Sequence, residues 1–447
     1  MKVLNPSQSW LGDIPSNWEV KRIKDIGLLI GGAGFPHDFQ GERDLELPFL
    51  KVVEIGSVES TEELTCASNT ISRETAKKLG ASIIRRGDIV FAKVGAALLL
   101  SRFRKIGTEC CIDNNMMAFR PSPKILPQFA LAALSRINFS DIVNPGAVPS
   151  INGGQIGRIE IALPPLETQQ RIAAFLDEKT ARIDGLIAKK RELLEWLAEK
   201  RQALITQAVT KGLNPDAPMK PSGIDWLGKI PAHWEVNCKL GFLAASEKNS
   251  FVNGPFGSDL LTSELLDEGV PVVYSGDVKA SGFNRKSNKC VTAEKAVTLD
   301  FCRVDSEDVL LAKVGDPPGD ACVYPTGSIS GIVTQDVVRI RVDQKTVNPY
   351  FLSYLLISNV GRYLVKQVSV EATRGRFSLA DLKGIRFPFP SIEEQEDVVL
   401  ELSATLEKLN KVRELHFLSI EKLTEYRSAL ITAAVTGQVD LEGGEVC

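Results

Sequence analysis

The stretch "AAFLDEKTARIDGLIAKKRELLEWLAEKRQALITQA" (173–208) places mostly apolar residues at alternating steps of three and four along its whole length. This heptad pattern is typical of a coiled-coil helix, whose apolar stripe needs a partner to exclude water. The stretch "VLELSATLEKLNKVRELHFLSIEKLTEYRSALITAA" (399–434) repeats the pattern 226 positions later. Because the two stripes match in length and register, the sequence predicts two long helices that pair with each other. The candidate positions for this pairing and for docking of partner proteins are Leu176, Ile183, Leu194, Leu197, Leu204, Leu402, Leu409, Leu423 and Leu430.

The helices belong to a larger internal repeat that covers both halves of the chain. The phrase "WLGDIPSNWEV" (10–20) returns as "WLGKIPAHWEV" (226–236), and the later matches keep their order. Two copies are too few for a solenoid, so we expect a molecule with pseudo-twofold symmetry. The later matches pair "DIVFAKVGA" (88–96) with "DVLLAKVGD" (308–316), "PPLETQQRI" (164–172) with "PSIEEQEDV" (390–398), and "RQALITQAVT" (201–210) with "RSALITAAVT" (427–436).

Each copy consists of a globular part followed by one of the helices. Short apolar runs between Gly, Pro and Asn breaks are typical of strands, and "PQFALAALSRI" (127–137) is typical of a helix opening at proline, so the globular parts are predicted to be mixed α/β. Since a whole globular part separates the two helices in the chain, we expect them to pair antiparallel, with one globular part at each end. The predicted segments are a first globular domain 1–163, a helix 164–212, a proline-rich linker 213–223, a second globular domain 224–389, a second helix 390–436 and a tail 437–447.

Composition places the chain among ordinary globular proteins. It has 447 residues, of which 44% are apolar and 24% charged, and it lacks both an 18-residue apolar run and the apolar core of a signal peptide. Eight cysteines without a CxxC pair indicate free thiols and a cytoplasmic location. The net charge is −3, and residues 390–447 alone hold 12 acidic against 5 basic residues. Charge by itself neither supports nor excludes binding to DNA.

Motifs for catalysis are missing from the sequence. Three scattered histidines give no metal-ligand spacing, and neither a phosphate-binding GxxxxGK[ST] loop nor a GxSxG serine elbow is present. Asp88 and Asp308 each stand five residues before a lysine, but the further carboxylate that a metal-dependent nuclease needs is replaced by apolar residues. The sequence therefore predicts a non-catalytic chain without a metal site, and an enzyme with an unrecognised site is the alternative.

Several loops are suited to contacting DNA. The glycine-rich segments "IGGAGFP" (30–36) and "NGPFGSD" (253–259) occupy corresponding places in the two copies, and Gly34 and Gly257 are the candidates in them. Tight turns explain these glycines equally well. Lys93 and Lys313 recur in both copies, which suits a shared contact to the DNA backbone or a repeated structural lysine.

Two arginine-rich segments add further candidates. In "LSRFRKIG" (100–107), the cations Arg102, Arg104 and Lys105 surround one aromatic residue, although a solvated strand edge would look the same. In "TRGRFS" (373–378), Arg374 and Arg376 flank a glycine, and such a loop can bind phosphates or grip guanine bidentately.

The start and end of the first helix resemble a known family. The element Pro-Pro-Leu-Glu-x-Gln and the "ALITQAVT" ending (203–210) are similar to the specificity subunit of type I restriction–modification systems. The second copy departs from the element at Ser391 and reads "EEQ" at 393–395, but it keeps the proline, glutamate and glutamine. The resemblance spans the entire chain. The element itself consists of Pro164, Pro165, Leu166, Glu167 and Gln169.

The resemblance implies a function and a set of partners. Each globular domain is then a target recognition domain that reads one half of a split, asymmetric site in double-stranded DNA, and the coiled coil sets the spacer. Two modification subunits, which carry S-adenosylmethionine and methylate adenine, dock on the helices, and restriction (motor-nuclease) subunits join them. This chain itself needs no cofactor. A coiled-coil scaffold that binds only protein partners is the alternative.

Overall fold

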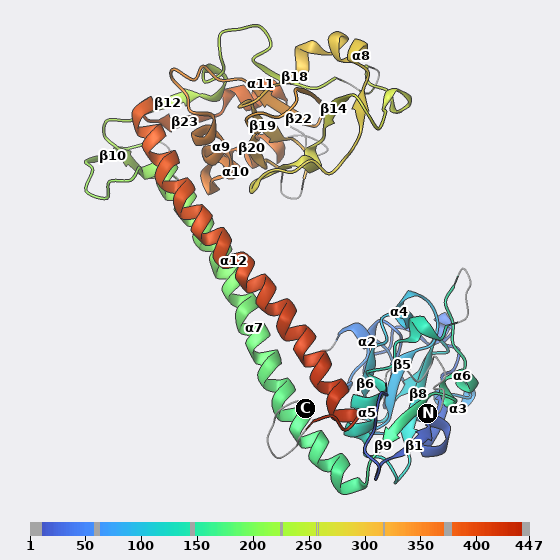
Figure 1. Cartoon of the computed structure of the whole chain (residues 1–447). Coiled ribbons are helices and arrows are strands. Elements are labelled where there is room, and N and C mark those ends of the chain that lie inside the picture. The colour runs from blue at the N-terminus through green and yellow to red at the C-terminus, as the bar shows by residue number, and fades with distance from the viewer. Residues whose placement is uncertain are drawn as a thin grey trace. The chain divides into compact units, whose positions relative to one another are not determined.

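The computed structural model describes residues 11–57, 63–143, 148–223, 227–255, 257, 259–315, 318–370 and 378–439. The chain forms two compact units (Figure 1). Unit 1 contains residues 1–190 and 417–447, and unit 2 contains residues 191–416. Each unit therefore combines one globular part with one end of each long helix. The division of the chain into six consecutive segments stays a prediction, because contacts group the halves of the helices with different globular parts.

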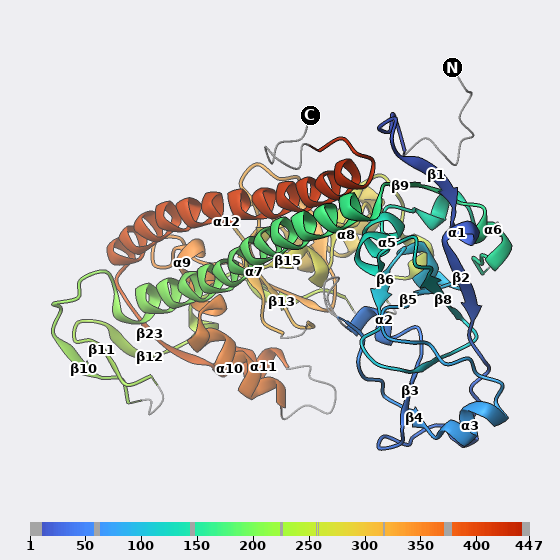
Figure 2. The ribbon, with the colours of Figure 1, turned by 90° about the horizontal axis from the view of Figure 1, so that it is seen from below.

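Helices α7 (Leu166–Lys211) and α12 (Ile392–Val435) have 46 and 44 residues. In unit 1, Leu176 near the start of α7 packs in one cluster with Leu430 near the end of α12. In unit 2, Ile205 near the end of α7 packs with Leu402 near the start of α12. The two helices therefore run antiparallel and side by side (Figure 2), as the sequence predicts. Each begins two residues later than expected, after the prolines that precede it.

The heptad stripe is the covered face of both helices. Leu176, Ile183, Leu402 and Leu430 are buried, and Leu194, Leu197, Leu204, Leu409 and Leu423 are half-buried.

The globular part of unit 1 holds a four-stranded antiparallel sheet in the order β2-β8-β5-β6 and a smaller sheet in the order β4-β3-β7. Phe91 and Phe119 belong to one buried apolar cluster of this globular part. Leu50 and Ile112 belong to a second buried apolar cluster. The strands are β1 (Glu19–Arg22), β2 (Gly27–Gly31), β3 (Leu47–Leu50), β4 (Thr70–Ile71), β5 (Ile89–Ala92), β6 (Phe103–Lys105), β7 (Cys111–Ile112), β8 (Met116–Pro121) and β9 (Glu160–Leu163). The helices are α1 (Ile23–Ile26), α2 (Glu54–Ser57), α3 (Arg73–Lys78), α4 (Ala96–Leu99), α5 (Pro127–Leu134) and α6 (Gly153–Gly157).

The globular part of unit 2 repeats this arrangement. Its main sheet has the order β13-β22-β19-β20, and its smaller sheet has the order β17-β14-β21-β18. The strands are β10 (Met219–Pro221), β11 (Lys229–Pro231), β12 (Glu235–Lys239), β13 (Phe251–Asn253), β14 (Val270–Val273), β15 (Val278–Lys279), β16 (Gly282–Phe283), β17 (Cys290–Val291), β18 (Arg303–Val304), β19 (Val309–Ala312), β20 (Ala321–Val323), β21 (Gly331–Val333), β22 (Val337–Ile340) and β23 (Arg386–Phe389). The helices are α8 (Ala293–Thr298), α9 (Pro349–Ile357), α10 (Asn359–Val370) and α11 (Leu379–Gly384).

The repeated tryptophan phrase packs against the end of a long helix in each unit. Gly212 follows α7 with φ +70°, and a Cβ there would lie 3.6 Å from Trp234. Gly437 follows α12 with φ +79°, and a Cβ there would lie 3.2 Å from Trp18. The left-handed backbone after each helix suits glycine and lets the chain turn against the indole. Trp10 and Trp226 lie outside the described residues.

The segment expected to be a linker contains regular structure. Its residues 219–221 form β10, which pairs antiparallel with β11. The hairpin lies directly before the Trp234 segment, so the irregular parts of 213–223 are residues 213–218 and 222–223. In the part of the chain that the structure describes, none of the helices combines the length and apolarity that crossing a bilayer requires.

Candidate nucleic-acid interface

Four segments of unit 1 meet at one end of the main sheet. The glycine-rich loop after β2 is joined to the turn before β8, because Ala33 forms a bridge with Asp113. The turn after β5 is joined to the same segment, where the Lys93 amide donates to the Asn115 carbonyl at 2.8 Å. The Ile151 amide donates to the Lys93 carbonyl at 3.0 Å and adds the segment before α6. Gly34 and Lys93 are therefore brought to the same end of the sheet.

Unit 2 builds the same end from the corresponding loops. The Gly254 amide donates to the Thr334 carbonyl at 3.2 Å, and the Lys313 amide donates to the Asp336 carbonyl at 2.8 Å. The loop with Gly257 and the turn with Lys313 are thus both anchored to the turn before β22. We call these two matching loop clusters the loop ends of unit 1 and unit 2.

The glycines of the two loops have different roles. A Cβ at Gly32 would lie 1.8 Å from the Asp113 oxygen, and a Cβ at Gly254 would lie 1.9 Å from the Val333 oxygen. These positions must be glycine because backbone packs directly on them. At Gly34 and Gly257, a Cβ would meet no heavy atom of the described residues within 4 Å. Gly34 and Gly257 thus lie open at the loop ends, and their contact with DNA stays a prediction.

Lys51 is a further cation at the loop end of unit 1. It follows β3, whose last residue Leu50 accepts a hydrogen bond from the Asp113 amide at 2.9 Å. The Lys51 ammonium lies 5.3 Å from the centre of the Phe35 ring and donates to Gln40 Oε1 at 2.7 Å. These contacts hold the ammonium in place beside the glycine-rich loop. Sequence reasoning missed it, because "LPFLKVVEI" (47–55) looks like an uninterrupted strand.

The cations of β6 are placed differently. Lys105 pairs across the ladder with Ile89, at the opposite end of β5 from Lys93, and its ammonium lies 2.9 Å from Glu63. Arg104 is only 8% exposed; it donates to the Phe103 carbonyl, and burial lowers the pKa of its guanidinium. Arg102 is exposed, but it lines a hollow of about 660 Å³ between β6, α5 and the long helices. Lys105 and Arg104 are therefore separated from the loop end. Arg102 precedes Phe103, which pairs with Phe91, so Arg102 stands at the same end of β5 as Lys93, and its contact with DNA stays a prediction. Arg374 and Arg376 lie outside the described residues.

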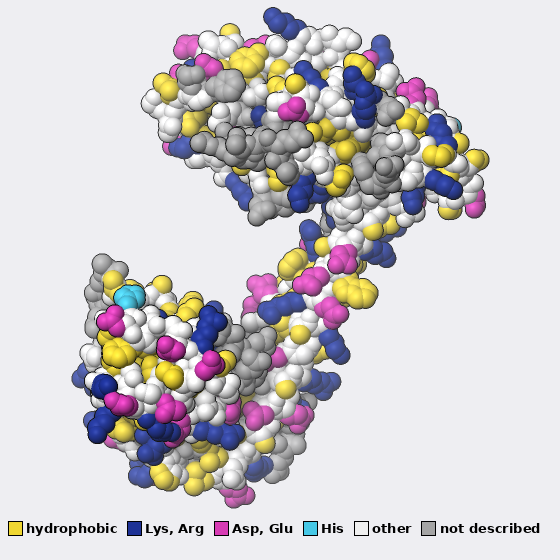
Figure 3. Space-filling view, turned by 180° about the vertical axis from the view of Figure 1, so that it is seen from behind, with side chains coloured by type: hydrophobic (Ala, Val, Ile, Leu, Met, Phe, Trp, Pro, Cys, Tyr) yellow, Lys and Arg dark blue, Asp and Glu magenta, His cyan; other side chains and the backbone are white. Residues whose placement is uncertain are grey.

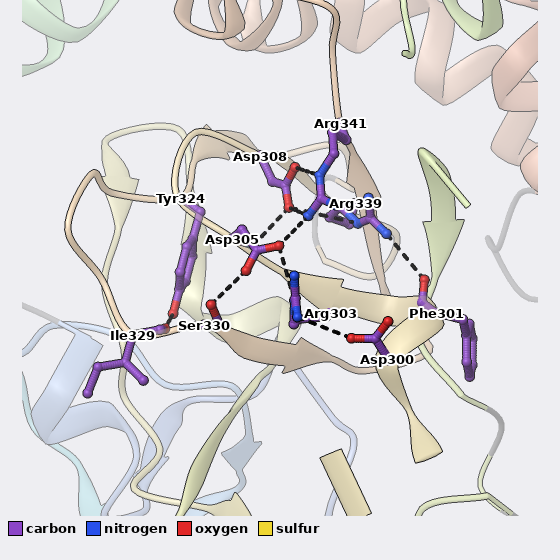
Figure 4. A network of polar contacts seen from close by, with 10 residues as sticks. All are labelled: Asp300, Phe301, Arg303, Asp305, Asp308, Tyr324, Ile329, Ser330, Arg339 and Arg341. Carbon is purple, nitrogen blue, oxygen red and sulfur yellow. Dashed lines mark hydrogen bonds and ion pairs between the residues drawn. The ribbon is translucent and has the colours of Figure 1, made fainter. Parts of the chain in front are cut away.

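The aspartates before the repeated lysines are held by arginines. Asp88 is 3% exposed, and its carboxylate accepts from Arg120 Nη2 at 2.7 Å. In unit 2, the Asp308 carboxylate accepts from Arg341 Nη2 at 2.8 Å (Figure 4). A buried carboxylate held by a guanidinium fork is a structural ion pair rather than a metal ligand. Among the described residues, no group of three His, Cys, Asp or Glu could hold a metal ion.

Asp305 belongs to the same network in unit 2 (Figure 4). Burial raises the pKa of its carboxyl. This effect is outweighed by a hydrogen bond from the Ser330 hydroxyl and by the positive charges of Arg303 and Arg341. The pKa of Asp305 therefore lies below its ordinary value. The network lies at the end of the main sheet opposite the loop end, because Asp308 precedes β19 and Arg341 follows β22.

The chain thus uses one mixed α/β unit twice, together with one antiparallel helix pair, and each copy has a loop end. The sequence model of the type I restriction modification DNA specificity domain matches residues 15–195 and 259–416. The chain belongs to this family.

Curated relatives agree over nearly the whole chain. A putative type I restriction enzyme MjaX specificity subunit from Methanocaldococcus jannaschii is 25% identical over 450 residues, covering 97% of this chain and 96% of the relative. The type I restriction enzyme StySPI specificity subunit from Salmonella potsdam is 23% identical over 406 residues, covering 87% and 82%.

Solved structures show the same fold. One chain, from a study of complex assembly and conformational transition of the type I R-M system, has a TM-score of 0.69 at 18% identity and covers 96% of this chain and 100% of that one. The HsdS subunit from Thermoanaerobacter tengcongensis has a TM-score of 0.50 at 17% identity and covers 96% and 98%.

Proposed function

We propose that this chain is the DNA sequence-specificity subunit of a type I restriction–modification complex, in which each globular part reads one half of a bipartite, asymmetric site. The observation that carries the proposal is that one scaffold presents the same loop end twice with different residues. The glycine-rich loop reads "IGGAGFP" (30–36) in unit 1 and "NGPFGSD" (253–259) in unit 2. Two similar readers with different loops recognise two different half-sites, so the whole site is not a palindrome.

The loop ends offer contacts of two kinds. Lys51, Lys93 and Lys313 can bind phosphates, which position a protein on the duplex without reading its sequence. Base reading needs side chains that reach the groove, and Arg374 and Arg376 are our candidates in the second copy. In the repeat they correspond to residues 148 and 150, and Ser150 forms a bridge with Val94 at the loop end of unit 1.

We further propose that two modification subunits dock on the long helices. The stripe leucines of α7 and α12 are covered by the partner helix and hold the pair together. Other apolar side chains of the helices are exposed (Figure 3), among them Trp196 at 63% and Leu415 at 66%. An apolar face on a charged helix marks a site of protein association. The exposed large apolar residues are Leu166, Leu186, Leu193 and Trp196 on α7 and Leu400, Val412, Leu415, Phe417, Leu418 and Tyr426 on α12.

In this scheme the chain reads DNA and does no chemistry. The modification subunits would carry S-adenosylmethionine and methylate adenine, and restriction subunits would join to cut unmodified DNA. The helices would fix the spacer between the half-sites.

Methylated positions in genomic DNA test the proposal directly. The chain is expressed with its modification subunits, and methylated adenines are mapped for the wild type and for Arg374→Ala/Arg376→Ala. We expect a split site for the wild type, and relaxed recognition of one half only for the variant. The pair Arg85→Ala/Arg86→Ala is the control, because both arginines are exposed and precede β5, at the strand end opposite Lys93. A continuous palindromic site, or equal loss at both halves, would contradict the proposal.

A further inference from the structure

A hollow of about 380 Å³ in unit 2 is lined by an excess of positive charge. It lies between α7, α12, the β15–β16 hairpin and α10, and four cationic side chains line it: Arg201, Lys279, Arg362 and Arg413. Among the described residues around it, Asp320 is the one carboxylate, and it already accepts a hydrogen bond from Arg362 at 2.5 Å.

The arginines of the hollow repel one another. Burial lowers the pKa of Arg201, Tyr354 opposes this, and the nearby guanidinium groups of Arg413 and Arg362 lower the pKa further. Arg201 donates to the Ala280 carbonyl at 3.0 Å. The Nε of Arg413 is buried and has no hydrogen-bond partner among the described residues. Buried donors of like charge are costly unless an anion accepts from them.

Unit 1 shows how the same place is neutralised in the other copy. Arg427 stands 226 positions after Arg201, and it donates to both carboxylate oxygens of Asp184 at 2.8 and 3.1 Å. At the same offset, unit 2 has Asn410 in place of Asp184 and Arg413 in place of Ile187. Compared with unit 1, unit 2 therefore has a neutral amide where unit 1 has an anion, and a cation where unit 1 has an apolar residue. In unit 1 the charge of Arg427 is neutralised by Asp184. In unit 2 the corresponding Asn410 carries no charge that could neutralise Arg201, so a bound anion could take the place of the carboxylate.

We propose that this hollow binds a phosphate group. Several guanidinium forks around one space match the oxygens of a phosphate, and a phosphate supplies more negative charge than a single carboxylate. The volume falls in the range of about 300–1,000 Å³ that small-ligand sites occupy. The phosphate belongs either to a free phosphorylated small molecule or to a DNA backbone. The inference does not depend on which bases the loop ends read.

Calorimetric titration of the full chain with pyrophosphate tests the site. We expect Asn410→Asp to weaken binding by about tenfold or more, because the new carboxylate pairs with Arg201 as Asp184 pairs with Arg427. Arg413→Ile, which restores the residue of unit 1, should have a similar effect. Lys408→Met is the control, since Lys408 is an exposed cation of α12 outside the hollow. Thermal unfolding without ligand checks that the variants fold; Asn410→Asp adds an ion pair and should keep the wild-type midpoint.

Duplex DNA, titrated at several salt concentrations, distinguishes the two sources of phosphate. Loss of pyrophosphate binding with unchanged DNA binding identifies a free phosphorylated ligand. Weaker DNA binding by Asn410→Asp, with a salt slope smaller by about one, identifies a backbone phosphate. If Asn410→Asp and Arg413→Ile bind both pyrophosphate and DNA as the wild type does, the inference is wrong.

Discussion

Gln169 Oε1 accepts a hydrogen bond from the Leu126 amide at 2.8 Å and so ties the first turn of α7 to the start of α5. Gln169 Nε2 donates to the carbonyls of Lys124 and Pro164 at 3.0 and 2.9 Å. Gln395 makes the same three bonds in unit 2, accepting from Asn348 and donating to the carbonyls of Thr346 and Pro390. Both side chains are fully buried. Each long helix is therefore fixed to the globular part that precedes it by one buried side-chain amide, whose oxygen and nitrogen are both hydrogen-bonded to backbone.

Gln169→Leu should lower the free energy of unfolding by about 3 kcal/mol, because a buried amide and two carbonyls lose their partner at once. Gln395→Leu should have a similar effect in unit 2. Gln207→Leu is the matched control, since Gln207 is exposed on α7. The measurement is urea-induced unfolding followed by circular dichroism. Equal midpoints for Gln169→Leu and Gln207→Leu would show that the bonds to α5 do not matter for stability.

The helical part of the fold could be predicted from sequence because its signal is long and periodic. Leu176 and Leu430 each belong to an apolar stripe of five heptads, and a stripe of this length determines which face of the helix is buried. The order of strands could not be predicted, because runs of two to six residues carry no signal of their partners. The pairs Asp88–Arg120 and Asp308–Arg341 explain the repeated aspartates, but their members lie about 30 positions apart in the sequence.

The candidate site could be predicted only in part. Composition marks the loops around Gly34 and Gly257 as glycine-rich, but only coordinates show that Gly32 and Gly254 are the glycines required by packing. The cations of "LSRFRKIG" (100–107) look alike in sequence, although Arg104 is buried and Arg102 is exposed. Strand alternation would place residues 102 and 104 on the same face. The difference arises because β6 begins only at Phe103, so Arg102 precedes the strand, and sequence does not fix this boundary.

Gly32→Ala and Gly34→Ala should separate folding from DNA binding at the loop end of unit 1. The Cβ of Gly32→Ala meets the Asp113 oxygen at 1.8 Å, so the free energy of unfolding should fall by about 2 kcal/mol or more. Gly34→Ala meets no described atom and should change stability by less than about 0.5 kcal/mol. If the loop approaches the DNA backbone, Gly34→Ala should weaken specific binding by the assembled complex by about tenfold in a filter-binding assay. Wild-type affinity for Gly34→Ala would remove this loop from the interface.

Stability should fall at alkaline pH because of buried thiols. Burial raises the pKa of Cys302 to about 12, whereas a thiol in an unfolded chain has a pKa of about 8.5. The unfolded state therefore releases this proton first, so the contribution to stability is complete below about pH 8.5 and is lost as the pH rises toward 12. Between pH 9 and 10.5, Cys302→Ala should flatten the decline of the unfolding free energy by about 1.4 kcal/mol per pH unit. Cys66→Ala, which removes an exposed thiol, is the control; identical slopes for the two variants would contradict the assignment.

Removal of one heptad from each long helix should shorten the spacer of the recognised site and leave both halves unchanged. Residues 191–197 of α7 and 413–419 of α12 are suitable, because seven residues preserve the stripe on both helices. The deletion shortens each helix by about 10 Å, which equals about three base pairs of B-form DNA. Methylated adenines mapped in a host that expresses the variant with its modification subunits would measure the new spacer. Deletion of five residues from each helix is the control, since it rotates the flanking parts of each stripe by about 140° relative to one another and should abolish methylation. An unchanged spacer with full methylation after the heptad deletion would mean that the helices do not set the distance between the half-sites.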